Sequence, residues 1–277
     1  MVDLHPERKA SQLELLGLPD AVAKRVCKEA LENDAIYRSR SLEELDLSQI
    51  HYGHAQMLEW AFRQAGSLKG KRILDVGIGD GYSSVQLALA GAEVTGIEVS
   101  RAALERAAAL GKRNNVKMDL QQMPGEDLRF ADGSFDGILC ISAFHHMDLE
   151  RAASEFARVL KHGGRAVLIE PLATNPPAWL YRRIGRFFRR EATSEERPLR
   201  GRDVEVLRPH FRKVRCQGMF LLSVGLFGLD RMWNNKNRFM HGITKAAFRW
   251  MWPLDERLLR VPGLQRIAWK IAIVAER

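Results

Sequence analysis

The sequence predicts an α/β fold built on a parallel sheet, and two observations carry that prediction. Between residues 72 and 170, short apolar runs alternate with segments of helical periodicity, a spacing typical of βαβ units. A glycine-rich turn follows the first apolar run, where such folds bind ligands. The chain has 277 residues, of which 46% are hydrophobic, so it is long enough to bury a substantial core.

The predicted elements follow one another in a regular order. Helical periodicity within residues 11–64 precedes the sheet. The predicted strands are 72–76, 93–99, 116–123, 135–142 and 166–170, and the predicted helices between them are 81–90, 101–114 and 149–160. After Pro171 the alternation stops. We expect two further strands, at 214–224 and 267–275, with a helical and aromatic-rich stretch over 225–264 between them.

The first strand, 72–76, runs into the turn Gly77-Ile78-Gly79-Asp80-Gly81 and then into a helix. Glycines let the backbone turn sharply and approach a ligand, and the helix N-terminus offers unpaired N–H groups. Glu98 ends the second strand about twenty residues further on, where a carboxylate accepts hydrogen bonds from ribose hydroxyls. These residues predict a site for an adenosine-containing cofactor. A tight strand-to-helix turn without a ligand is the structural alternative.

The acidic residues of the turn distinguish between two adenosine cofactors. A dinucleotide fingerprint needs a third glycine where this sequence has Tyr82. The carboxylates of Asp75 and Asp80 would repel a pyrophosphate but attract the ammonium group of a methionine moiety. The turn therefore favours S-adenosylmethionine over a nicotinamide dinucleotide.

Four sequence strings carry a resemblance to a known family. In order and spacing they resemble the successive motifs of class I S-adenosylmethionine-dependent methyltransferases, in the style of the type 11 small-molecule subgroup. The strings lie within about residues 70–171 and are ILDVGIGDG, VTGIEVS, GEDLRFADGSFDGILCISAFHHM and EFARVLKHGGRAVLIEP. The resemblance implies a Rossmann-like, doubly wound sheet of seven strands whose last strand is antiparallel. We expect a helical lid over 1–66, a cofactor-binding core over 67–173, and a basic cap with the last two strands over 174–277.

The resemblance also implies which residues hold the methionine and ribose parts of S-adenosylmethionine. Asp75 would lie near the ammonium group, and Glu98 would hold the ribose. The methionine part would be lined by Gly77, Gly79 and Gly81. Tyr52, in the segment before the first strand, would act as a lid residue.

The resemblance implies further contacts to the adenine. Val99 would pack on the ring, and Ile141 and Ser142 would close the pocket after the fourth strand. The family often has Gly-Asp-Ala before the next acidic pair, where this chain has Met123-Pro124-Gly125. The polar adenine contact would therefore fall to backbone groups, or to Glu126 or Asp127 beside the adenine edge.

Candidate catalytic residues follow the fourth and fifth strands. Methyl transfer needs alignment of the reacting atoms, and a base when the nucleophile carries a proton. His145 and His146 follow the fourth strand and Glu170 ends the fifth, and we favour His146 as the base. The alternatives are a helix cap or cofactor wall for the histidines and an ion pair with an arginine for Glu170. Because no Cys or carboxylate has metal-ligand spacing to these histidines, we expect no metal site.

Positive charge is concentrated in the last third of the chain. Residues 1–173 carry 21 basic and 25 acidic side chains, whereas residues 174–277 carry 22 and 9, with five of the six tryptophans. In 179–190 and 226–260, aromatic and basic residues are interleaved. A solvated cap, an anionic membrane surface and a nucleic acid all fit this pattern. The chain shows no recognised RNA-binding module, so a nucleic-acid partner is the least favoured of the three.

The sequence as a whole predicts a methyltransferase that uses S-adenosylmethionine and acts on a small, hydrophobic acceptor, such as a lipid, an isoprenoid-like compound or another secondary metabolite. Three cysteines without a C-x-x-C pair fit a reducing compartment. The N-terminus lacks the apolar region of a signal peptide, and the longest apolar run is too short to span a bilayer. We therefore expect a cytoplasmic protein, with peripheral membrane contact left open. An RNA or protein methyltransferase and a catalytically silent cofactor-binding scaffold remain alternatives.

Overall fold

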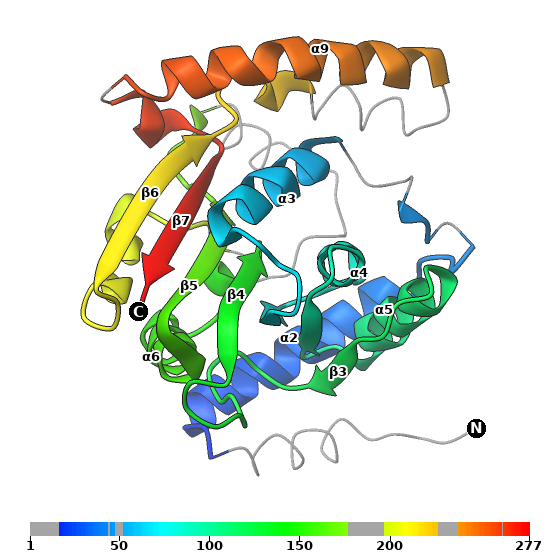
Figure 1. Cartoon of the computed structure of the whole chain (residues 1–277), viewed down its shortest axis with the longest axis vertical. Helices are drawn as coiled ribbons and strands as arrows, with labels where there is room; N and C mark the ends of the chain where they lie inside the picture. Colours follow the sequence, from blue (N-terminus) through cyan, green and yellow to red (C-terminus); the bar gives the residue numbers. More distant parts are fainter. Residues whose placement is uncertain (1–16, 44, 48–51, 177–196, 227–237, 262) are drawn as a thin grey trace.

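A seven-stranded sheet lies at the centre of the computed structural model (Figure 1). The structure describes residues 17–43, 45–47, 52–176, 197–226, 238–261 and 263–277. The strands are β1 (Arg72–Val76), β2 (Glu93–Glu98), β3 (Asp119–Gln122), β4 (Phe135–Ile141), β5 (Leu160–Pro171), β6 (Lys213–Met219) and β7 (Lys270–Glu276). Their order is β3-β2-β1-β4-β5-β7-β6. The last strand, β7, pairs antiparallel with both β5 and β6, which confirms the predicted fold class.

Helices precede the sheet and connect its strands, and one long helix lies in the last connection, between β6 and β7. The described α-helices are α2 (Asp20–Arg38), α3 (Tyr52–Ala65), α4 (Tyr82–Leu89), α5 (Arg101–Arg113), α6 (Leu149–Val159) and α9 (Arg238–Leu258). Short 3₁₀ helices are η2 (Phe144–His146), η3 (Gly201–Leu207) and η4 (Leu264–Ile267). Side-chain hydrogen bonds cap the N-termini of two helices. The Ser100 hydroxyl accepts from the Ala103 N–H at the start of α5, and the Asp148 carboxylate accepts from the Arg151 N–H at the start of α6.

The core lies on both faces of the sheet, because successive strand residues point to opposite sides. On one face, Leu74 and Leu168 pack with residues of α6 and η3. On the other face, Ile73 and Val167 pack with residues of α3 and α9, including Trp252. The helix α3 therefore belongs to the packing of the sheet. The predicted division of the chain into lid, core and cap stays a prediction.

The strand β6 is shorter than the predicted strand over 214–224. It ends at Met219 because Phe220 adopts a left-handed conformation with a φ of 61°. The backbone N–H groups of Leu221 and Leu222 then donate to the buried Asp255 carboxylate of α9, at 3.0 and 2.8 Å. The chain thus leaves the sheet into the predicted helical stretch earlier than its apolar sequence suggests.

The pairing of the last strands determines where this stretch lies. Lys270, the first residue of β7, is paired with Met219 on one side and with Pro171, the last residue of β5, on the other. Residues 220–269 are therefore inserted at the edge of the sheet where the parallel strands end. Figure 1 shows α9 along the top of the molecule, beyond the ends of β6 and β7. No helix in the described ranges combines the length and apolar content needed to cross a bilayer.

Candidate functional site

A cleft opens between α2 and the loops that follow β1, β2 and β4. We call it the glycine-loop cleft. Its lining residues come from both sides and include Val26, Glu29, Asn33 and Tyr37 of α2, Arg40 just beyond its end, and Gly77, Glu98, Val99, Glu126, Ser142 and His146 of the core. The cleft lies at the carboxyl ends of the parallel strands, where α/β sheets bind ligands.

The glycines of the turn are required by their backbone conformation and by close neighbours. Gly77, Gly79 and Gly81 have φ values of 70°, 52° and 81°, a region that other residues rarely adopt. A Cβ atom on Gly79 would lie 2.6 Å from the Tyr37 hydroxyl, and one on Gly81 would lie 2.6 Å from the Cβ of Ala107. The turn therefore lets α2 and α5 approach the loop closely. Of its three glycines, Gly77 lines the cleft, whereas Gly79 and Gly81 do not.

Glu98 is held at the base of the cleft by backbone donors. Its Oε2 accepts from the Gly79 N–H at 3.1 Å, and its Oε1 accepts from the N–H groups of Val99 and Ser100 at 2.9 and 3.1 Å. Burial raises the pKa of Glu98, and these three donors oppose the shift. A carboxylate oxygen can accept more than one hydrogen bond, so Oε2 can also receive a ribose hydroxyl.

Asp75 lies beneath the glycine loop. Only 1% of it is exposed, and its carboxylate accepts from the Ser84 hydroxyl of α4 at 2.6 Å. Burial raises the pKa of Asp75 to about 7. Asp75 does not line the glycine-loop cleft, so its place beside a methionine ammonium stays a prediction.

The residues predicted to lie beside the adenine differ in whether they line the glycine-loop cleft. Val99 and Glu126 line the cleft, and Glu126 accepts from the Asp148 N–H at 2.9 Å and from the Arg25 guanidinium. Ser142 also lines it and accepts from the Lys270 ammonium at 2.5 Å. The remaining two, Asp127 and Ile141, do not line it.

The predicted lid residue Tyr52 begins α3, and its side chain lies outside what the structure describes. The described part of α3 does not line the cleft. The element that covers the cleft is α2, which the sequence analysis did not single out residue by residue. Its pattern of apolar and charged residues resembles that of any surface helix, so periodicity alone does not distinguish a cofactor lid from an ordinary packing helix.

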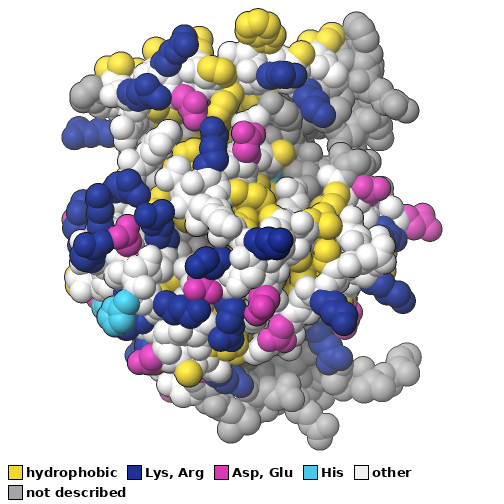
Figure 2. Space-filling model, in the orientation of Figure 1, with side chains coloured by type: hydrophobic (Ala, Val, Ile, Leu, Met, Phe, Trp, Pro, Cys, Tyr) yellow, Lys and Arg dark blue, Asp and Glu magenta, His cyan; other side chains and the backbone are white. Residues whose placement is uncertain are grey.

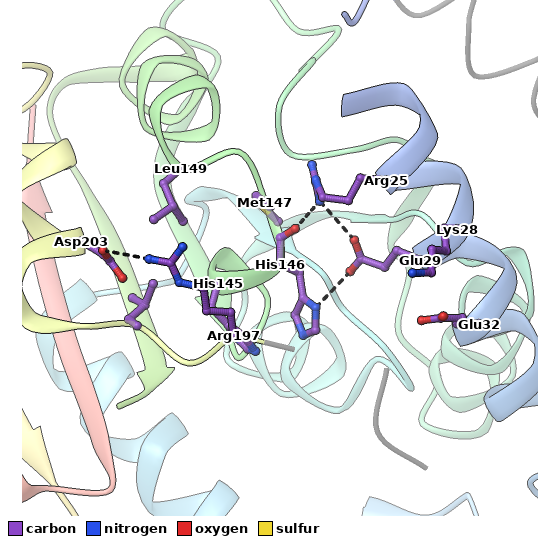
Figure 3. Close-up of a pocket in the computed structure, with 11 residues that line it drawn as sticks. Arg25, Lys28, Glu29, Glu32, His145, His146, Met147, Leu149, Arg197 and Asp203 are labelled. Carbon is purple, nitrogen blue, oxygen red and sulfur yellow. Dashed lines mark hydrogen bonds and ion pairs between the residues drawn. The ribbon is translucent and has the colours of Figure 1, made fainter. Parts of the chain in front are cut away.

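A second cavity adjoins the glycine-loop cleft. We call it the histidine pocket; Figure 3 shows α2 on one side of it and the segment after β4 on the other. Glu29, His146 and Met147 line both cavities, so the two meet at these residues. The other lining residues are Arg25, Lys28, Glu32, His145, Leu149, Arg197, Leu199 and Asp203.

Glu170 and His145 form a buried pair at this pocket. Glu170 is fully buried and accepts from the N–H groups of Ala143 and Phe144 at 3.1 and 2.9 Å. Its other oxygen lies 2.5 Å from Nδ1 of His145. Glu170 thus holds the turn after β4 and orients the imidazole, in place of the ion pair with an arginine that was one prediction.

The second ring nitrogen of His145 is chemically available. With Nδ1–H donated to the Glu170 carboxylate, Nε2 of the neutral ring carries the lone pair. This Nε2 is buried and has no hydrogen-bond partner among the described residues. His145 lines the histidine pocket, so the structure offers a proton acceptor there.

His146 lies at the junction of the two cavities. Its Nδ1 is 3.7 Å from a carboxylate oxygen of Glu29, and its backbone carbonyl accepts from Arg25 (Figure 3). Burial and the neighbouring His145 lower the pKa of His146 to about 4. Burial also raises the pKa of Glu29 to about 8. Glu29 is therefore a site residue that the sequence analysis missed.

The helix α2 is fastened to the core beside both cavities. The Asp34 carboxylate accepts from the Ser100 hydroxyl at 2.7 Å and from the Ala102 N–H at 3.1 Å, at the start of α5. Arg40, just beyond α2, and Arg106 of α5 both pair with Asp80 of the glycine loop, at 3.2 and 2.5 Å. Within the described residues, no group of three or more His, Cys, Asp or Glu side chains is arranged to hold a metal ion.

Comparisons with known proteins identify a domain in the middle of the chain. Residues 74–168 match a family model described as a methyltransferase domain. A ubiquinone biosynthesis O-methyltransferase of Bordetella parapertussis is 34% identical over 143 residues, which cover 51% of this chain and 59% of the relative. The O-methyltransferase resE of Aspergillus sclerotiorum is 43% identical over 108 residues, or 38% of this chain and 41% of the relative. This chain thus spans less than two thirds of the length of these curated relatives.

Solved structures share the fold at low sequence identity. The YcgJ protein of Bacillus subtilis has a TM-score of 0.53 and 21% identity, over 81% of this chain and 99% of that one. Geranyl diphosphate C-methyltransferase of Streptomyces coelicolor, in complex with Mg²⁺, geranyl diphosphate and S-adenosyl-L-homocysteine, has a TM-score of 0.54 and 17% identity, over 81% and 79%. With its motifs, sheet order and family match together, residues 74–168 form a methyltransferase domain of the class I S-adenosylmethionine-dependent family.

Proposed function

We propose that the protein transfers the methyl group of S-adenosylmethionine to a hydroxyl of a small, hydrophobic acceptor. The observation that carries the proposal is the meeting of two cavities at His146: the glycine-loop cleft, with Glu98 at its base, and the histidine pocket, with the His145–Glu170 pair at its wall. One cavity suits the cofactor and the other suits the acceptor.

The residues of the glycine-loop cleft fit S-adenosylmethionine. Gly77 lines the cleft without a side chain, and the buried Glu98 carboxylate suits a ribose diol. Residues Gly77, Glu98, Val99 and Glu126 would hold the cofactor. When bound, it supplies an activated methyl group on a sulfonium.

The histidine pocket supports an oxygen acceptor. A hydroxyl must lose its proton as it becomes methylated, and Nε2 of His145 is placed to take it. The Glu170 carboxylate then stabilises the imidazolium through Nδ1. Two relatives whose names describe O-methyltransferases support the same chemistry. We therefore assign the base to His145, with His146 as the residue that separates cofactor from acceptor.

We further propose that the hydrophobic acceptor is met at an anionic membrane surface, through the basic and aromatic segments 179–190 and 226–260. The first segment lies outside the described residues. In the second, the described residues of α9 expose apolar and basic side chains, which supports this proposal.

The test is methyl transfer from labelled S-adenosylmethionine into a cell extract that is then separated into lipid, RNA, protein and small polar fractions. We expect label in the organic-soluble fraction as an ether, and none when His145→Ala replaces the wild-type protein. Label in RNA or protein would contradict the proposed acceptor. Cofactor binding without label in any fraction would identify a catalytically silent scaffold.

A further inference from the structure

The helix α9 has two apolar faces, and only one of them is covered. On the covered face, Phe248 and Trp252 are 1% and 8% exposed and pack into the core beside Phe220. Asp255, on the same side, is 1% exposed and bonds to the turn after β6. These contacts determine which side of α9 faces the core.

On the uncovered face, Ile243, Trp250 and Leu254 are 46%, 81% and 45% exposed. Trp250 and Leu254 follow Ile243 by seven and eleven residues, so all three lie within about 40° of one another around the helix axis. They form one continuous stripe, which we call the α9 stripe. A tryptophan that is 81% exposed carries a large apolar area into water, which is uncommon for a residue that is highly buried on average.

The α9 stripe is bordered by cations. Arg249 and Arg257 are exposed, and their helical positions place them on one side of the stripe. Arg260, two residues beyond the end of α9, is exposed as well. The acidic residues nearby do not balance them, because Asp255 is buried on the opposite face and Glu256 is half-buried. Figure 2 shows hydrophobic and basic side chains next to one another over the top of the molecule, where α9 lies.

The stripe lies on the insertion at the catalytic edge of the sheet. Six of the nine large hydrophobic side chains that are exposed among the described residues fall between positions 222 and 267. That insertion leaves the sheet where the parallel strands end, and Lys270 at its end bonds to Ser142 of the glycine-loop cleft. A surface bound by the α9 stripe would therefore lie at the edge of the sheet where the two cavities open.

We propose that the α9 stripe docks the protein on the surface of an anionic lipid bilayer. Trp250 would enter the boundary between headgroups and acyl chains, since its ring is apolar and its N–H can remain near water. Arg249, Arg257 and Arg260 would contact lipid phosphates, each adding to the electrostatic attraction. This inference rests on the proposed function, because a lipid-soluble acceptor gives the docking its purpose.

The test is co-sedimentation of the full-length protein with vesicles of phosphatidylcholine alone, or of phosphatidylcholine with roughly one third phosphatidylglycerol. We expect binding to the anionic vesicles and much weaker binding to the neutral ones. Raising salt to about 1 M, where the Debye length is about 3 Å, should release the protein. Trp250→Ser should weaken binding about tenfold, and Arg249→Glu by a similar factor.

Matched controls come from surfaces away from the insertion. Leu89→Ser removes a side chain on α4 that is 56% exposed, and Arg101→Glu reverses an exposed charge on α5. Both controls should bind vesicles as the wild type does. Equal binding by the control and α9 variants, or equal binding to both kinds of vesicle, would overturn the proposal.

Light scattering in the absence of lipid tests whether a second copy of the chain, rather than a bilayer, covers the α9 stripe. A dimer that Trp250→Ser dissociates would identify a second copy of the chain as the partner of the stripe and overturn the proposal. RNA that displaces the protein from vesicles through Arg249, and binds it in their absence, would do the same. Because no cofactor or acceptor is added, these assays succeed or fail independently of the methyl-transfer assay.

Discussion

His145 is held by one nitrogen and offers the other. The buried Glu170 carboxylate lies 2.5 Å from Nδ1, and the buried Nε2 has no hydrogen-bond partner among the described residues. His145 is also one of the residues that line the histidine pocket. An unpartnered buried nitrogen has a cost in stability unless a ligand uses it. That arrangement is characteristic of a general base whose substrate is absent.

Replacing His145 by Ala should therefore lower kcat by about 10²- to 10⁴-fold, the usual contribution of a general base. The affinity for S-adenosylhomocysteine should stay unchanged, because His145 does not line the glycine-loop cleft. Single-turnover methyl transfer and calorimetry measure the two quantities. His162→Ala, at an exposed position of β5, is the matched control and should keep wild-type activity.

Under the proposed function, Glu170 would act as a positioning residue through its contact with His145. Glu170→Gln should lower kcat, and the double variant with His145→Ala should be no slower than His145→Ala alone, because the two side chains work as a unit. Losses that multiply in the double variant would show that Glu170 has only a structural role in holding the turn after β4.

Asp75 makes stability depend on pH. Its folded pKa of about 7 lies above the unfolded value of about 3.9, so the folded state binds the proton more tightly. The stability that this bound proton adds to the folded state is present at acidic pH and is lost as the pH rises through 7. Urea denaturation should show that Asp75→Asn reduces the fall in unfolding free energy between pH 5 and 8 by about 1–3 kcal/mol.

Ser84→Ala is the companion variant for Asp75. It removes the hydroxyl whose hydrogen bond opposes the raised pKa, so the fall in stability with pH should continue to higher pH than in the wild type. Identical pH dependence in Asp75→Asn and the wild type would remove Asp75 from this account.

At the scale of elements, α2 governs access to both cavities. Figure 1 shows α2 beside α5. Core residues form hydrogen bonds with Arg25 and Asp34 of α2 and with Arg40 just beyond its end. We expect these contacts to open when a cofactor enters the glycine-loop cleft beside this helix. The opening should be visible in hydrogen exchange of the α2 amides.

Arg25→Met removes the guanidinium that bonds to Glu126 and to the His146 carbonyl. We expect exchange of the α2 amides to accelerate about tenfold, which corresponds to about 1.4 kcal/mol in the free energy of local opening. Arg38→Met is the matched control, because among the described residues its exposed side chain forms an ion pair only with Asp34 of the same helix. Similar acceleration in both variants would contradict the assigned role of Arg25.

The helices and strands that could be predicted from the sequence are those that local residue patterns determine. The glycine turn, Glu98 and the alternation of strands and helices follow from period and spacing, and they fixed the sheet correctly. The end of β6 could not be predicted, because Phe220 continues the apolar pattern while its backbone is left-handed. The role of α2 depends on tertiary contacts, such as Tyr37 against Gly79, that no local pattern encodes.

At the scale of the whole molecule, charge and chemistry are divided along the chain. Glu98 and Glu126, the acidic residues of the core that line the glycine-loop cleft, belong to the part of the chain that carries 21 basic and 25 acidic side chains. The basic excess lies in residues 174–277, which include the insertion that carries α9. The net charge of the protein, +9, therefore comes from the last third of the chain, which we propose meets the acceptor, and not from the part that holds the glycine-loop cleft.

The central claim is that the glycine-loop cleft binds the cofactor with Glu98 on its ribose, and one calorimetric titration tests it most directly. S-adenosylhomocysteine should bind the wild-type protein with a measurable heat. Glu98→Gln, which keeps the size of the side chain but loses its charge, should weaken the affinity by about 1–3 kcal/mol. No heat with the wild type, or the same affinity in Glu98→Gln, would contradict the account.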